Sequence, residues 1–203
     1  TGHTFGAWTD PIRGVGYKTR ECTKCEEIEK EAVNPFTDVV AGQWYFEGVM
    51  YAAGCGYMKG TNASMTLFSP SMQFTREQFV QLLFNMEGLN SADFAGDTGF
   101  SDVPAGQWYS AAVKWAKEEG VTNGVGGGVF GLGGKVSREQ LSQFLKNYAE
   151  LKNKDTSARS DVNAFSDASS VSGWATEAVS WAVAEGIIGS TQSGAMVLAP
   201  GRV

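Results

Sequence analysis

Two stretches of the chain carry apolar residues at the spacing of an amphipathic helix. In the first stretch the apolar positions follow at intervals of three, one, three and three residues: Phe79, Leu82, Leu83, Met86 and Leu89. The same pattern recurs 62 residues later, as Leu141, Phe144, Leu145, Tyr148 and Leu151. Such spacing puts one set of side chains on a single helical face. We therefore expect two long helices that present the same face to a shared central bundle.

A helix-start signal precedes each of these stretches. The segments Thr75-Arg76-Glu77-Gln78 and Ser137-Arg138-Glu139-Gln140 have the form of capping boxes. In a capping box the first side chain accepts the backbone N–H of the fourth residue, and the fourth side chain reaches back. The sequence stops two residues before a third such segment would begin. We therefore expect the chain to be a fragment of a longer protein that continues with a third long helix.

A shorter helical pattern, opened by a tryptophan, precedes each long one and ends near a glycine. It covers residues 44–53, 108–116 and 174–182. Phe36, Asp38 and Trp44 recur 64 residues later, and close counterparts follow again at Phe165, Asp167 and Trp174. Three copies at one period indicate a repeat array. The predicted division is a first segment at 1–33, then repeats at 34–90 and 91–151, and a linker with a truncated third repeat at 152–203.

Residues 1–33 have a different character. Threonines and aromatic residues alternate around glycines, which predicts two short strands, and we expect Glu26 to Val33 to be an acidic helical connector. Cys22 and Cys25 have the spacing of a metal knuckle, and His3 is a third candidate ligand. Three ligands are one short of a closed zinc site, so a small disulfide or two free thiols is the favoured interpretation and no metal is predicted.

Composition narrows the choice of partners. The chain has 203 residues, 42% of them hydrophobic, and a formal net charge of −6, which fits a folded protein better than a disordered one. We find no basic stripe and no apolar run long enough to span a membrane, so nucleic acid and membrane insertion are not expected. The single histidine, His3, lies outside the repeats, so no serine or cysteine nucleophile in the repeats has a histidine base.

The repeats together resemble the S-layer homology family. The resemblance is carried by Phe-x-Asp-Val, Trp, Ala-Val-x-x-Ala, Gly, Phe-x-Pro and Thr-Arg-Glu in that order, over residues 34–203. It implies an all-α fold of three helical repeats in a pseudo-threefold arrangement around a central bundle, here preceded by a short β/loop segment. Residues 1–33 are similar to short repeats of large Gram-positive surface proteins. The implied location is the secreted surface layer and cell wall.

The resemblance also implies a function. Members of the family anchor surface proteins non-covalently to secondary cell-wall polysaccharide linked to peptidoglycan, through a pyruvylated sugar bound in grooves between repeats. The arginine of the Thr-Arg-Ala-Glu motif is a principal ligand residue in that family, and this role falls here on Arg76 and Arg138. An arginine in the first turn of a helix offers a bidentate donor beside free backbone N–H groups, which suits a carboxylate. The alternative is that each arginine pairs with an acid across the bundle.

Further candidate ligand residues have competing structural explanations. Trp44 and Trp108 could stack on sugar faces, although packing in the core is favoured for them and for Trp174. Asp38 and Asp102, with Asp167, are expected to cap helix starts, with ligand or calcium contact as the alternative. Glycines such as Gly60 and Gly124 could let backbone approach a sugar or could simply end helices.

Three function classes can be compared on these observations. Adjacent acids such as Glu118 and Glu119 point about 100° apart on a helix and do not form the carboxylate pair of a glycosidase, so we predict no enzyme activity and no cofactor. A wall-binding module is the preferred function. The alternative is an assembly scaffold of the surface layer, in which the incomplete third repeat leaves an apolar stripe for self-association.

Overall fold

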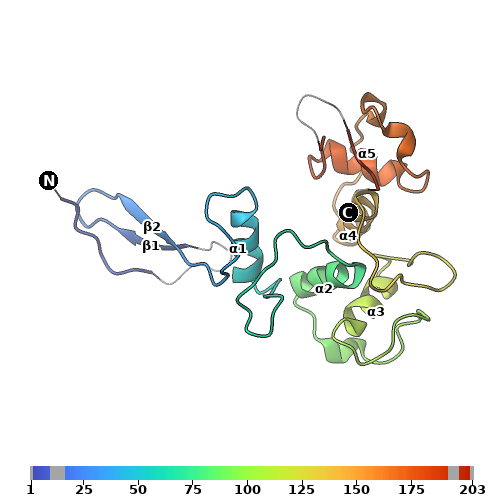
Figure 1. Ribbon diagram of the computed structural model, residues 1–203, viewed down its shortest axis with the longest axis horizontal. Coiled ribbons are helices and arrows are strands. Elements are labelled where there is room, and N and C mark those ends of the chain that lie inside the picture. Colours follow the sequence, from blue (N-terminus) through green and yellow to red (C-terminus); the bar gives the residue numbers. More distant parts are fainter. Residues whose placement is uncertain (1, 10–16, 192–196, 202–203) are drawn as a thin grey trace. The chain divides into compact units, whose positions relative to one another are not determined.

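A computed structural model describes residues 2–9, 17–191 and 197–201 (Figure 1). In these residues the regular secondary structure is mostly helical, with five α-helices and one two-stranded sheet. It divides into two compact units, Thr1–Met72 and Gln73–Val203. None of the described helices is both long enough and apolar enough to cross a lipid bilayer.

The first unit begins with an antiparallel hairpin. Strand β1 is Tyr17–Glu21 and strand β2 is Ile28–Ala32. The two predicted short strands are therefore present, but the helical connector predicted for Glu26 to Val33 is wrong. Opposite charges on facing positions explain the pairing: Lys18 faces Glu31 with an N–O distance of 3.0 Å, and Arg20 bonds Glu29 through Nε at 2.6 Å. Facing charges of opposite sign stabilise strand pairs.

The rest of the first unit is built around helix α1, Phe46–Gly54. The predicted helix at 44–53 is confirmed, with its start two residues later. A small core forms here from Phe36, Val39, Phe46, Val49 and Met50. Cys55, at the C-terminal end of α1, is buried.

The second unit contains the other four helices: α2 Arg76–Glu87, α3 Ser110–Glu118, α4 Arg138–Leu151 and α5 Thr176–Ala184. Short 3₁₀ turns occupy Ser91–Phe94, Val162–Ala164 and Ala168–Ser170. Both capping boxes are confirmed, since Thr75 and Ser137 each accept the N–H three residues on and each glutamine side chain reaches back. Helix α2 packs on α3, and α4 packs on α5 (Figure 1).

The two predicted apolar faces meet in the core of the second unit. The rings of Phe79 on α2 and Phe144 on α4 are both buried, with centroids 5.4 Å apart. Leu145 on α4 packs against this cluster and also against a second cluster around α5. Met86 departs from the pattern because it is exposed. Helix α4 therefore joins the second repeat to the third.

Candidate functional site

The most buried of the described arginines begins helix α2 and faces the second repeat. Arg76 is only 4% exposed, and its Nε donates to the carbonyl oxygen of Phe130 at 2.8 Å. One of its Nη atoms lies 3.4 Å from Thr122 Oγ1. Its guanidinium carbon is 4.9 Å from the ring centroid of Phe144 and 5.1 Å from that of Phe130. Burial lowers the pKa of Arg76, against the opposing charges of Asp102 and Glu77, but an arginine stays protonated in proteins.

This arginine lines a pocket of about 630 Å³ within the second unit, a volume in the usual range for small-ligand sites. The second repeat contributes a glycine-containing loop and one face of α4, and the third contributes a tryptophan. The lining residues other than Arg76 are Gly120, Val121, Thr122, Asn123, Gly124, Val125, Gln140, Gln143, Phe144, Asn147 and Trp174. The pocket thus combines one buried cation, several amide groups, loop backbone and two aromatic rings.

Side-chain amides on α4 are held in place at the pocket wall. Asn147 Nδ2 donates to the carbonyl of Val121 at 3.0 Å, and Gln143 Nε2 donates to Asn147 Oδ1 at 2.7 Å. Sequence reasoning did not single out Gln143 and Asn147, and it identified Gln140 only as a capping-box residue. Their spacing of three and four residues places them on one face of α4, so a polar stripe beside the apolar one was the signal that could have identified them.

The three repeated tryptophans are exposed, so the prediction that they pack in the core is wrong. Trp44, Trp108 and Trp174 are 91%, 60% and 56% exposed. Each stands two residues before the first residue of its helix, so its side chain does not lie on the helix face that packs inwards. The buried tryptophans are instead Trp115 and Trp181, in the middle of α3 and α5. Of the exposed three, Trp174 lines the pocket with Arg76.

The repeated aspartates fasten loops, and the prediction that they cap helices is wrong. Asp38 accepts the N–H groups of Phe68 and Ser69 at 2.8 and 2.7 Å. Asp102 accepts three such groups and Asp167 two, at equivalent loop positions. Each of these carboxylates bonds a loop about 30 residues later in the chain and therefore does not cap the start of a helix. Burial would raise the pKa of Asp102, but the N–H donors of the loop outweigh burial and lower it.

Two of the candidate glycines are required by close approach of their own loops. A Cβ on Gly124 would lie 2.2 Å from the carbonyl oxygen of Val129, and its φ is +80°. A Cβ on Gly60 would lie 2.5 Å from Met65 Cα. Gly120 and Gly186, by contrast, adopt the left-handed conformation directly after helices, a position where glycine commonly ends a helix.

Arg138 repeats the contact made by Arg76. Its Nε donates to the carbonyl of Leu198 at 2.8 Å and one Nη donates to that of Gly189 at 2.6 Å. Leu198 holds the position in the third repeat that Phe130 holds in the second. Both arginines therefore bind a loop carbonyl of the following repeat, and the charges of Asp102 and Asp167 act on Arg76 and Arg138 respectively. The neighbouring glutamates also bind the backbone of the following repeat, but as acceptors. Glu77 accepts the N–H of Gly133, and Glu139 accepts the N–H of Ser172.

The predicted ligand residues are thus partly brought together. Arg76 and Gly124 line the pocket. Asp38, Trp44 and Gly60 belong to the first unit. The remaining candidates lie in the second unit but are not among the described residues that line this pocket: Trp108, Asp102 and Arg138.

Comparison with known proteins agrees with the repeat pattern. The S-layer homology domain matches residues 35–80, 99–142 and 164–195. The chain is 31% identical over 134 residues to the Surface-layer 125 kDa protein of Lysinibacillus sphaericus, covering 66% of this chain and 11% of that protein. It is 30% identical over 145 residues to an endoglucanase of Bacillus sp. (strain KSM-635), covering 71% and 15%. It is also 27% identical over 128 residues to Exoglucanase XynX of Acetivibrio thermocellus, covering 63% and 12%.

The chain therefore spans only a small part of the length of these curated relatives. The matched domain occurs three times in tandem and accounts for more than half of the chain. Such domains mark secreted proteins of the bacterial cell surface. By its repeats and its relatives, this chain belongs to the S-layer homology family.

Proposed function

We propose that this chain anchors a larger surface protein to the cell wall by binding an acidic secondary polysaccharide in the pocket around Arg76. Cell-wall anchoring is the function of S-layer homology domains in general. The polysaccharide, its pyruvylated sugar and the pseudo-threefold arrangement of the repeats are part of the proposal. We infer that the fragment itself is not catalytic and that any enzyme activity resides elsewhere in the parent protein.

The observation that carries this proposal is a buried cation in an open polar pocket. The Arg76 guanidinium is fixed by Phe130 O and by two aromatic rings, so little side-chain freedom remains to be lost when a ligand binds. A ketal-linked pyruvate presents a carboxylate, and charge-assisted bonds to arginine are among the stronger hydrogen bonds. Gln143 and Asn147 offer amides to sugar hydroxyls, and Trp174 offers an exposed ring face.

Sedimentation with purified sacculi, before and after chemical removal of the secondary polymer, tests the proposal. Binding should be lost on removal of the polymer. Trp174→Ala should weaken binding to intact sacculi by roughly tenfold, because losing a buried aromatic contact costs about 1–2 kcal/mol. Trp108→Ala is the matched control, since Trp108 has similar exposure and the same repeat position but does not line the pocket.

Arg76 has a structural role as well, so its substitution needs a folding control. Arg76→Lys keeps the charge and removes the planar fork, and we expect weaker binding by a chain whose thermal unfolding is checked in parallel. Equal binding by Trp174→Ala and Trp108→Ala would place the ligand elsewhere. Binding that survives removal of the polymer would point to peptidoglycan, whereas self-association without wall binding would favour the assembly scaffold.

A further inference from the structure

Three metal-ligating side chains gather at the turn of the N-terminal hairpin. One imidazole nitrogen of His3 and the sulfurs of Cys22 and Cys25 all lie within 4.8 Å of one another. His3 Nδ1 is 3.1 Å from Cys25 Sγ, and neither cysteine is in a disulfide. A tetrahedral zinc site with Zn–S bonds of about 2.3 Å places neighbouring ligand atoms about 3.8 Å apart. The three atoms are therefore within about 1 Å of metal-binding separation.

The backbone brings these residues together from two parts of the chain. Phe5 forms a bridge with Cys22, and Thr23 N donates to the carbonyl of Thr4 at 2.8 Å. These contacts hold the segment that carries His3 against the turn that carries both cysteines. Residues 2–9 thus supply one ligand, His3, and the Cys-x-x-Cys turn supplies the other two.

The turn itself has the form of a metal knuckle. Glu26, directly after the second cysteine, has φ = 61°, a left-handed conformation that is unfavourable for a residue with a side chain. The turn is closed by the Cys22 N–H, which donates to the carbonyl oxygen of Glu27 at 2.8 Å. Two cysteines separated by two residues in such a turn have the ligand spacing of structural zinc sites.

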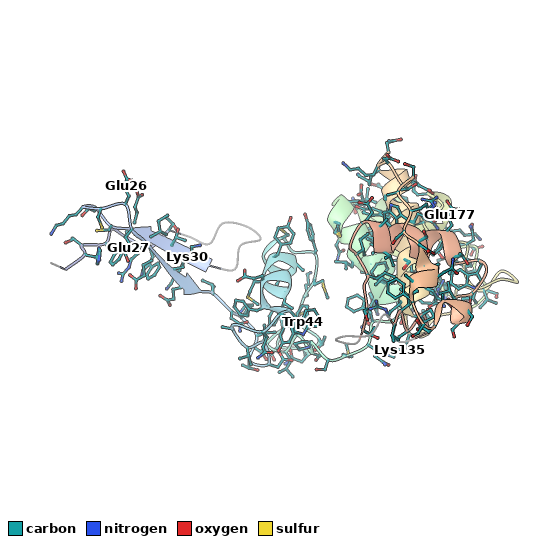
Figure 2. The ribbon with its side chains drawn as sticks, turned by 90° about the horizontal axis from the view of Figure 1, so that it is seen from above. Glu26, Glu27, Lys30, Trp44, Lys135 and Glu177 are labelled. Carbon is teal, nitrogen blue, oxygen red and sulfur yellow. The ribbon has the colours of Figure 1, made fainter. Side chains whose placement is uncertain are left out.

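The Glu27 carboxylate contacts the His3 ring nitrogen other than the one that lies near Cys25. His3 Nε2 lies 2.9 Å from Glu27 Oε2, and Glu27 sits at the turn end of the hairpin (Figure 2). A proton held on Nε2 by that carboxylate leaves the lone pair on Nδ1, which faces the sulfurs. Metal-binding histidines usually have such an outer partner.

The hairpin also needs stabilisation that its packing does not supply. The apolar clusters of the described residues contain no member from residues 2–9 or 17–32. Of the hydrophobic side chains described in this segment, only that of Cys22 is buried, at 4% exposure. A two-stranded hairpin without a core is marginally stable in water, and small units of this kind are often held by a metal or disulfide.

We propose that His3 Nδ1, Cys22 Sγ and Cys25 Sγ bind one Zn²⁺, with water as the fourth ligand, and that the ion holds the N-terminal segment to the hairpin. Two thiolates and an imidazole form a ligand set suited to zinc. Binding releases the two thiol protons to solvent, and no electron transfer is needed. The site is separate from the wall-binding pocket, so it does not depend on the function proposed above.

The first experiment uses the full 203-residue chain, reduced and stripped of metal. Titration with Co²⁺ should give one equivalent per chain, a thiolate charge-transfer band in the near ultraviolet and the intense visible bands of tetrahedral cobalt, and Zn²⁺ should displace it. Cys22→Ser and Cys25→Ser should abolish stoichiometric binding, whereas Cys55→Ser, at the buried cysteine of α1, should leave it unchanged. Glu27→Gln should weaken zinc binding by about tenfold.

A second measurement separates a metal site from a misfolded variant. Zinc should slow amide hydrogen exchange in β1 and β2 of the unaltered chain and leave exchange in α2 to α5 unchanged. The proposal is overturned if the reduced chain shows no charge-transfer band with Co²⁺, or if the Cys22→Ser, Cys25→Ser double variant binds as well as the unaltered chain. It is also overturned if a Cys22–Cys25 disulfide forms in air equally fast with and without zinc.

Discussion

The hairpin of residues 17–32 and the helical unit that follows Met72 are stabilised by different kinds of contact. The hairpin has facing charges and rings under cations, such as Arg20 over Trp8 at 4.5 Å. The helical unit has two apolar clusters, with polar ties at their edges. Burial of apolar area is additive and insensitive to salt, whereas exposed ion pairs are weak and screened. The two regions should therefore respond separately to perturbation.

Removing the central ring should have the largest effect on the helical unit. Phe144 is buried between Phe79 and the Arg76 guanidinium. Phe144→Ala should lower the free energy of unfolding of this unit by about 3–5 kcal/mol. Calorimetry would measure this loss, and hydrogen exchange in β1 and β2 should stay unchanged. Equal loss of protection in the hairpin would show that the two regions unfold together.

Removing a loop-fastening carboxylate should have the next largest effect. Asp102→Ala leaves the N–H groups of Phe130, Gly131 and Leu132 without their acceptor, at a cost of about 1–3 kcal/mol. Asp155→Ala is the control, because its exposed side chain accepts only from Ser157 and should change the unfolding free energy by less than about 0.5 kcal/mol. Similar losses in both variants would argue against a fastening role.

The same aspartate should make the helical unit sensitive to acid. Its pKa is lowered in the folded chain, so the unfolded chain binds a proton more readily. Stability from Asp102 is therefore complete above the ordinary aspartate value of about 3.9 and is lost as the pH falls through the lower folded value. Unfolding curves between neutral pH and pH 3 should show this loss, and Asp102→Asn should flatten it.

The capping boxes should contribute a smaller, local effect. Thr75→Ala removes the acceptor for the Gln78 N–H and should cost about 1 kcal/mol in the helical unit. Ser137→Ala should behave alike at α4. Thr75→Asp retains the cap and serves as the rescue variant, and failure of that rescue would contradict this explanation.

The smallest effect is expected from a single facing pair in the hairpin. Glu29→Gln removes the partner of Arg20 and should cost about 0.2–1 kcal/mol, as for other partly exposed pairs. Raising the salt concentration should weaken the hairpin in the same direction while the melting temperature of the helical unit is nearly unchanged. Hydrogen exchange in β2 at low and high salt would measure how the substitution and the salt each affect the hairpin. Protection that does not depend on salt would exclude the charge explanation.

The sequence predicted the features that depend on local pattern. Helical periodicity identified α2 and α4, and capping-box chemistry located their first residues, because both are decided within a few positions. Trp44, Trp108 and Trp174 were misplaced because a residue two positions before a helix start does not lie on the inward face of that helix. The strand at Ile28–Ala32 was misread because its facing partners Lys18 and Arg20 lie a turn away.

The pocket could be predicted only in part, for a related reason. Arg76 stood out by its motif, but its contact with Phe130 spans 54 residues. Which loop carbonyl it binds depends on how consecutive repeats pack. Trp174 comes from a third repeat, and its place in the lining of the pocket follows from the packing of α4 on α5 rather than from any local signal.

The packing of α2 on α3 bears on how such arrays are copied and engineered. The helix that closes the first repeat packs on the second, and Arg76 and Glu77 reach into that neighbour as well. A gene segment cut at the repeat boundary near Asn90 would separate these partners, whereas a cut after Met72 would keep them together. We therefore expect fusion partners and shuffled arrays to express best when joined after Met72, since duplication of one repeat alone supplies only half of each interface.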